Sequence, residues 1–146
     1  MTLDTTIERV QFAYPQIYYA CHTRHERRRS DAVQLSMRDS EMLVHLDRAT
    51  PTTVSALARH MDLARSTVSE AMTALERHGY VVKRPLGDRD RRHVGLVLTD
   101  KAVAAVRATS VLETARLRTV LLRLPPRERE VVADALTRFA RACRKP

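Results

Sequence analysis

The central part of the chain contains, at residues 57–75, the sequence LARHMDLARSTVSEAMTAL. Its apolar residues recur at intervals of three and four, which places them on one face of a helix. The spacing is interrupted at Asp62, a residue type that tolerates left-handed backbone and so permits a tight turn. The stretch therefore predicts two short helices that cross at the small residue Ala58 and pack their apolar faces together, as in a helix-turn-helix.

A hairpin is predicted directly after these two helices. Gly79 follows the second helix as a C-terminal glycine cap. The strand-like run 80–84 comes next, and a charged loop separates it from a second apolar run at 94–98. Two strands around a polar loop form a hairpin, so residues 35–99 are expected to form one winged helix lobe.

Capping residues and prolines set the expected ends of the earlier helices. Asp4 is expected to cap the first helix, and Pro15 to break or restart it because proline has no N–H. The second stretch runs from Pro15 to about Arg29. Ser36 and Thr53 are expected to cap the next two helices.

Two further helices are expected after the hairpin. Thr99 caps a long helix over about 100–123, and the pair Pro125-Pro126 ends it. A last helix begins at Pro126. The expected fold class is therefore mainly α (α+β), with a two-stranded wing, in a single domain over residues 1–146.

The chain is strongly basic. Lysine and arginine number 26 against 17 acidic residues, a net charge of +9, and all but Lys83, Lys101 and Lys145 are arginine. This excess favours a polyanionic partner, either nucleic acid or an anionic membrane surface. No apolar run is long enough to cross a bilayer, and residues 1–10 lack the apolar core of a signal peptide. We expect a cytoplasmic protein with no membrane partner.

The surface of the predicted second helix suits a DNA groove. A recognition helix presents its N-terminal residues to base edges in the major groove, where Arg pairs with guanine and the Thr methyl meets thymine. A plain surface helix, with Ser and Thr assisting its cap, is the alternative. The residues expected to face away from the core are Arg65, Ser66, Thr67, Ser69, Glu70 and Thr73.

The hairpin loop reads Asp88-Arg89-Asp90-Arg91-Arg92. Arginines at a hairpin tip reach phosphates or a narrow minor groove. Arg89, Arg91 and Arg92 are therefore expected to contact DNA, and Asp88 and Asp90 to orient them through forked salt bridges. The alternative is a solvated charged turn, which explains three arginines at this position less well than DNA contact does.

This loop and the strand after it, Val94–Thr99, resemble the wing of MarR-type regulators. The segment Leu75–Val81 resembles the exit from that family's recognition helix, although Asp62 stands where many helix-turn-helix proteins carry glycine. The chain is identified on these residues as a member of the MarR family, and the helix order agrees along nearly its whole length.

The resemblance implies a sequence-specific double-stranded DNA-binding transcription regulator that acts as a homodimer on a pseudo-palindromic site. It assigns 35–99 to DNA binding and the terminal helices, 4–29 and 100–143, to dimerisation. It also implies a repressor that responds to a small aromatic effector held between the dimer helices and the DNA-binding lobe.

The effector or sensor site has five candidates, which are Tyr18, Cys21, His22, His25 and His45. On a helix, His22 and His25 or Cys21 and His25 share a face and so could hold a metal or a haem iron. Cys21 and His22 are adjacent, however, so all three cannot converge, and ordinary packing is the expectation. No cofactor is therefore expected, and Cys21 is also a candidate for oxidation.

Two alternatives to a ligand-responsive repressor stay open. One is a regulator that senses metal, haem or thiol oxidation, and the other is a non-specific architectural DNA binder. Two cysteines, Cys21 and Cys143, make neither a disulfide framework nor a metal knuckle. No nucleophile with its base, phosphate loop or paired carboxylates occurs at a useful spacing, so we do not expect an enzyme.

Overall fold

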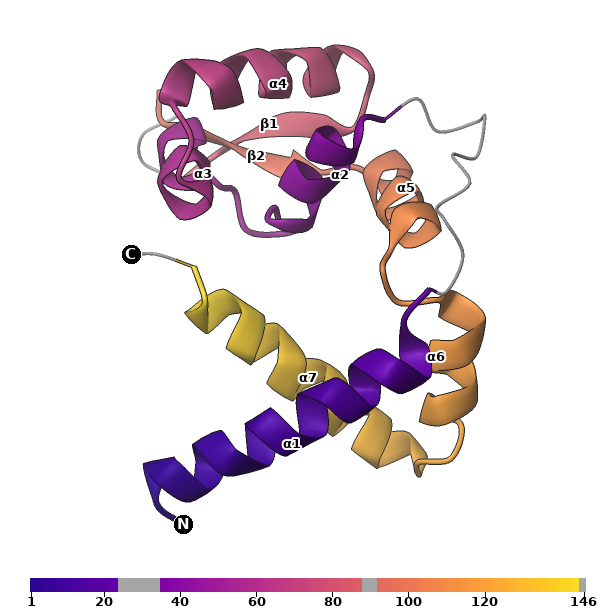
Figure 1. Ribbon diagram of the computed structural model, residues 1–146. Helices are drawn as coiled ribbons and strands as arrows, with labels where there is room; N and C mark the ends of the chain where they lie inside the picture. Colours follow the sequence, from indigo (N-terminus) through magenta and orange to yellow (C-terminus); the bar gives the residue numbers. More distant parts are fainter. Residues whose placement is uncertain (24–34, 88–91, 145–146) are drawn as a thin grey trace. The chain divides into compact units, whose positions relative to one another are not determined.

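The structure of the protein is a computed structural model that describes residues 1–23, 35–87 and 92–144 (Figure 1). It is mainly helical with one antiparallel two-stranded sheet, which confirms the expected fold class. The described chain divides into two units, one from 1–23 with 110–139 and the other from 35–109 with 140–144. Within these described residues no helix combines the length and the apolar character that a membrane span requires.

The helix-turn-helix forms as predicted, from α3 (Val54–Met61) and α4 (Arg65–Arg77). The Thr53 side chain caps α3 by accepting a hydrogen bond from a backbone N–H at 3.0 Å. Asp62 ends α3 in the left-handed conformation, with φ of 57°. The turn is closed by the Leu63 N–H, which donates to the backbone of α3 at 2.9 Å.

The core of the second unit lies where α2 (Met37–Val44), α3 and α4 meet the hairpin. Ser36 caps α2, accepting from the backbone N–H of Asp39 at 3.0 Å. The residues that are almost completely buried in this core are Met42, Leu43, Leu57, Val68 and Val81. The apolar faces predicted from the helical spacing therefore meet in a single core.

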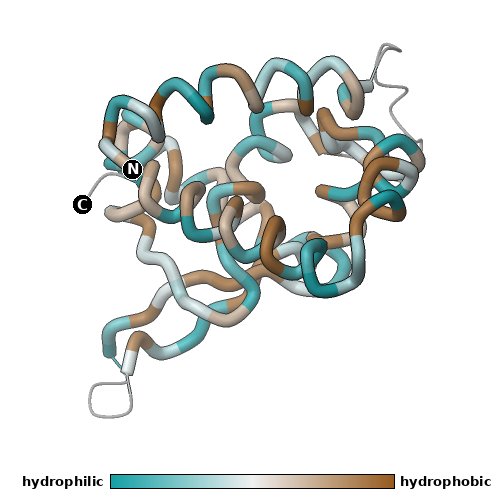
Figure 2. Tube along the Cα trace, turned by 90° about the horizontal axis from the view of Figure 1, so that it is seen from below, coloured by the Kyte–Doolittle hydropathy of each residue, from teal (hydrophilic) through white to brown (hydrophobic). Residues whose placement is uncertain are grey.

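The hairpin consists of β1 (Val81–Pro85) and β2 (Val94–Leu98), and it carries both hydrophobic and hydrophilic residues in Figure 2. Thr52 extends this sheet, because its backbone exchanges two hydrogen bonds with Leu96, of 3.1 and 2.8 Å. No local signal in the sequence predicts this contact. It explains Gly95, where a Cβ would lie 2.7 Å from the side chain of Pro51.

The helix expected over 100–123 is wrong as a single element. Thr99 does cap α5 (Asp100–Thr109), but that helix ends there and α6 (Thr114–Leu121) begins anew. The backbone between α5 and α6 forms hydrogen bonds with the end of the first helix of the chain and does not continue the helical hydrogen bonds of α5. The Thr23 N–H donates to the Val111 carbonyl at 2.8 Å, and the Glu113 N–H to the Cys21 carbonyl at 2.8 Å.

The first helix, α1 (Leu3–Cys21), also differs from expectation. It runs without interruption through Pro15, whose missing N–H removes one helical hydrogen bond without ending the helix. Thr2 caps it instead of Asp4, accepting from a backbone N–H at 3.2 Å. The helix ends at Cys21 and does not continue as one element to Arg29.

The first unit is a helical arrangement of α1, α6 and most of α7 (Pro126–Ala142). The start of α7 at Pro126 confirms the prediction. The α1 helix packs against α6. The Arg129 side chain ties α7 to the end of α6, donating from Nε to the carbonyls of Leu121 and Leu124 at 2.9 Å each.

Candidate nucleic-acid interface

The α4 helix presents one polar face to solvent. Val68, Met72 and Leu75 recur at intervals of four and three and are buried, which fixes the rotation of the helix in the lobe. Thr67 is half-buried, and the Thr73 hydroxyl donates to the Ser69 carbonyl at 2.9 Å. The predicted DNA-facing residues that are exposed on α4 are Arg65, Ser66, Ser69, Glu70 and Thr73.

The N-terminal end of α4 is suited to an anion. Its N-cap is Ala64, which makes no side-chain capping bond, and no acidic residue lies in the first turn. The first N–H groups of a helix have no partner within the helix, and the helix dipole places partial positive charge there. With the exposed Arg65 at the first position, this end can receive a phosphate or a guanine edge.

The base of the hairpin is attached to α4. Lys83 lies 3.9 Å from the carboxylate of Glu76, and the cation of Lys101 sits 4.5 Å from the centre of the Tyr80 ring, just before β1. Exposed cations continue along the hairpin at Lys83, Arg84 and Arg92. Of these, Arg92 is a DNA contact predicted from the sequence. Lys83 and Arg84 are not among the predicted contacts, although both directly follow the apolar pair that begins β1.

The remaining wing residues fall outside the described part of the chain. These are Asp88, Arg89, Asp90 and Arg91, so their expected roles in contacting DNA and orienting arginines stay predictions. The described parts of β1 and β2 lead towards them with a fixed register in which Arg84 faces Gly95.

Three of the sensor candidates lie together at the end of α1. The rings of Tyr18 and His22 stack, with centroids 4.2 Å apart, and the Cys21 side chain beside them is only 1% exposed. His25 lies outside the described residues. Across the described residues, no three His, Cys, Asp or Glu side chains gather in a way that would hold a metal ion.

His45 pairs with a residue of the helix-turn-helix. Its Nδ1 lies 2.9 Å from Nε2 of His60 on α3, which is hydrogen-bond distance. Burial lowers the pKa of His45 below its usual value of 6.5, the positive charges of His60 and Arg144 lower it further, and Glu41 opposes them. In the folded chain His45 therefore favours the neutral form, in which an imidazole nitrogen can accept the shared proton.

Comparison with known proteins relates this lobe to one family. Residues 35–94 match the model of the MarR family. No curated protein sequence matches the chain.

Three solved structures share the fold over nearly the whole chain. MepR of S. aureus bound to ethidium bromide is 17% identical, with a TM-score of 0.54 over 97% of this chain and 96% of its own. FabT of Streptococcus pneumoniae in complex with DNA is 20% identical, with a TM-score of 0.53 over 96% of both chains. Zinc-responsive ZitR of Lactococcus lactis is 20% identical, with a TM-score of 0.51 over 97% of this chain and 99% of its own.

Proposed function

We propose that the chain is a member of the MarR family, whose model matches residues 35–94, and that it is a sequence-specific, double-stranded DNA-binding transcription regulator. In this proposal it acts as a homodimer on a pseudo-palindromic site and represses transcription until a small molecule binds. The observation that carries the proposal is the exposed polar face of α4, whose uncapped N-terminal end begins with Arg65. A surface of this kind reads base edges in the major groove.

The hairpin also supports DNA binding by this lobe. It belongs to the same unit as α4 and packs against it through β1. Its exposed cations, together with the net charge of +9, supply the attraction to phosphate on which DNA affinity depends. In this proposal α4 reads sequence, and the hairpin binds backbone or minor groove beside it.

The first unit supports a homodimer, because it exposes apolar residues that a monomer would leave in water. On α1 these include Ile7, Tyr14 and Ile17, and on α7 they include Leu136 and Phe139. Apolar faces of this extent mark interaction surfaces. A second copy of the chain would cover them and place two α4 helices on the two half-sites of a palindrome, about 34–36 Å apart.

Selection from a random pool of double-stranded DNA tests sequence-specific binding directly. We expect the bound fragments to share an inverted repeat whose half-sites are about one helical turn apart. Recovery of unrelated sequences would favour the architectural DNA binder instead. A salt series separates the two further, because a non-specific binder gains nothing from a selected site at any ionic strength.

The role of Arg65 is tested with a matched control on the same helix. Arg65→Ala should cost about 1–3 kcal/mol of binding at the selected site and relax base preference at one position. Arg77→Ala removes the same side chain from the last turn of α4 and should leave base preference unchanged. If Arg65→Ala lowers affinity equally for all sequences, Arg65 contacts phosphate and does not read bases.

Ligand control is tested by release of this DNA complex. Two proteins of this fold are described as ethidium-bound and as zinc-responsive, which supports a search among small organic molecules and metals. A regulator of the proposed kind loses DNA affinity when its effector is added and regains it when the effector is removed. An affinity that no tested organic molecule, metal or oxidant changes would contradict ligand control and leave DNA binding intact.

A further inference from the structure

The C-terminal end of α4 is held by the residues that begin α5. The Thr99 N–H donates to the Tyr80 carbonyl at 3.1 Å, and the Thr99 hydroxyl donates to the Gly79 carbonyl at 2.7 Å. Lys101, in the first turn of α5, donates from Nζ to the carbonyl of His78 at 2.6 Å. His78 is the C-cap residue of α4, so a side chain of α5 caps the end of the helix proposed to read DNA.

The cation of Lys101 suits this place for two reasons. The last carbonyls of a helix carry partial negative charge, which attracts a cation. The Lys101 ammonium also lies 4.5 Å from the centre of the Tyr80 ring, and the face of an aromatic ring attracts a cation too. Tyr80 is buried in the core of the lobe, so its ring is a fixed surface. The lysine therefore joins the end of α4 to this core through its charge as well as through a hydrogen bond.

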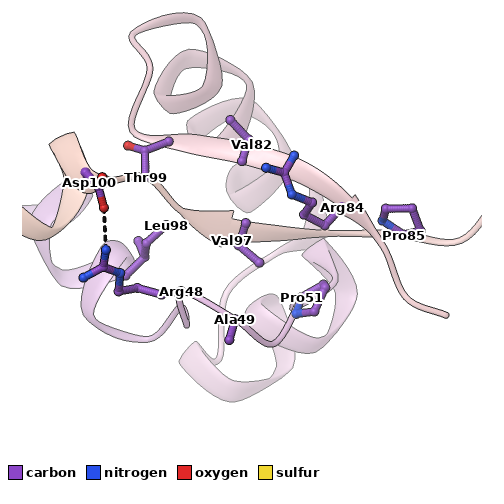
Figure 3. Close-up of a pocket in the computed structure, with 10 residues that line it drawn as sticks. All are labelled: Arg48, Ala49, Pro51, Val82, Arg84, Pro85, Val97, Leu98, Thr99 and Asp100. Carbon is purple, nitrogen blue, oxygen red and sulfur yellow. Dashed lines mark hydrogen bonds and ion pairs between the residues drawn. The ribbon is translucent and has the colours of Figure 1, made fainter. Parts of the chain in front are cut away.

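The first turn of α5, from which Lys101 extends, is itself fixed in the lobe. Ala102 is completely buried in the core, and its N–H donates to the Thr99 hydroxyl at 3.2 Å. Asp100 forms an ion pair with Arg48 of the segment after α2, as Figure 3 shows. Lys101 therefore reaches α4 from a rigid support. No carboxylate of the described residues forms an ion pair with its ammonium.

A support at this end of α4 affects the opposite end, where Arg65 lies. The helix has 13 residues, which span about 20 Å at a rise of about 1.5 Å per residue. Over that length a tilt of about 3° about the C-terminal end displaces Arg65 by about 1 Å. Such a shift exceeds the range of distances over which a hydrogen bond to a base edge keeps its strength. Attraction between separated charges changes much less over the same shift.

We propose that Lys101 is a positioning residue for sequence reading, because its hold on the C-terminal end of α4 sets the direction in which the helix presents Arg65 to base edges. The lysine acts through α4 and does not itself contact DNA. This inference rests on the proposed DNA-binding function. Loss of the Lys101 cation then lowers affinity for the selected site and spares the general attraction to DNA. Loss of a cation that contacts phosphate, as proposed for the hairpin, lowers both.

Amide hydrogen exchange in the full chain without DNA tests whether Lys101 holds this end of α4. The Gly79 and Tyr80 N–H groups close the helix by donating to carbonyls of its last turn, at 3.0 and 2.9 Å. In Lys101→Met, which keeps the apolar stem and removes the cation, we expect both amides to exchange at least about threefold faster. Lys101→Arg keeps a cation that can donate to the same carbonyl and should restore the slower exchange. Arg84→Met, at an exposed cation of β1, is the control and should leave both rates unchanged.

DNA binding by the same variants tests the effect on sequence reading. We expect Lys101→Met to bind the selected site about tenfold more weakly and an unrelated duplex less than about twofold more weakly, with an unchanged salt dependence. Lys101→Arg should bind both duplexes as the wild type does. Arg84→Met should weaken both duplexes by a similar factor and lower the salt slope by about 1, as loss of a phosphate contact does.

Two results would refute the positioning role. If Lys101→Met weakens both duplexes equally and lowers the salt slope, Lys101 contacts phosphate. If the amides exchange faster but discrimination between the duplexes is unchanged, the lysine only stabilises the end of α4. Failure of the proposed function looks different, because the wild-type chain itself then selects no DNA sequence. In that case the role in sequence reading falls with it, whereas unchanged exchange rates in Lys101→Met refute the hold on α4 whatever the chain binds.

Discussion

The two units of the chain differ in how far their apolar side chains are buried. In the second unit Leu57 and Val68 are at most 1% exposed and belong to one continuous core. In the first unit Phe12 is 69% exposed and Phe139 56%, and Cys21 is the only described residue that counts as buried. The lobe therefore has a core of its own, whereas the helical unit exposes apolar faces of the kind that interaction surfaces carry.

The largest effect is expected from the core of the lobe. Leu57→Ala should lower the free energy of unfolding by about 2–5 kcal/mol, because it removes a completely buried side chain and leaves a cavity. Urea unfolding followed by circular dichroism measures this loss. Leu122→Ala, at an exposed leucine just after α6, is the control and should change stability little. Similar losses in the two variants would remove the contrast between the units.

The exposed face of the helical unit gives the next prediction. Phe139→Glu should weaken the proposed homodimer at least about tenfold, because it would place an unpaired charge in the apolar interface proposed for this face. Sedimentation over a range of protein concentrations measures the dissociation constant. Thr137→Glu adds the same carboxylate to an exposed polar position of α7 and is the control. A wild-type chain that stays monomeric at all concentrations would contradict the assignment of this face.

A smaller effect is expected where the segment after α2 joins the hairpin. Gly95→Ala should cost about 1–3 kcal/mol, since the new Cβ would lie 2.9 Å from the backbone nitrogen of Thr52 and force the segment away. Gly87→Ala is the control, because a Cβ there meets nothing within 4 Å. Thermal unfolding of both variants measures the difference. An unchanged unfolding temperature for Gly95→Ala would show that the segment at Pro51 and Thr52 can move away from the hairpin at little cost in stability.

The sequence predicted the lobe more accurately than the helical unit, and the physical reason is the same contrast. Local signals specify the lobe, including the caps at Ser36 and Thr53 and the left-handed turn at Asp62. At the break after Thr109, by contrast, the backbone bonds to residues almost 90 positions earlier, such as Thr23 to Val111. No local pattern encodes such a pairing, so the sequence alone predicts one helix that continues to residue 123.

The candidate site shows the same limit. Helical spacing was enough to find the exposed face of α4, because burial of Val68, Met72 and Leu75 leaves only one other side. The pairing of Thr52 with Leu96 could not be predicted, because neither residue carries a local signal for it. The pairing of His45 with His60, 15 residues apart, could not be predicted from the sequence either.

This histidine pair gives the smallest effect, a pH dependence of the lobe's stability. The pKa of His45 is lowered in the folded chain, chiefly by burial, so folding favours its neutral form. Well above pH 6.5 the imidazole is neutral in both states and contributes no difference. As the pH falls below 6.5, the unfolded chain binds the proton more readily, and stability declines until the folded chain also binds it.

Urea midpoints at about pH 7.5 and about pH 5.5 should therefore show a less stable lobe at the lower pH. His45→Gln removes the titrating group and should flatten this dependence, whereas His93→Gln, at an exposed histidine of the hairpin loop, should leave it in place. If the slope survives in His45→Gln, other groups carry the acid sensitivity. The pair then acts only as a structural hydrogen bond between the end of α2 and α3.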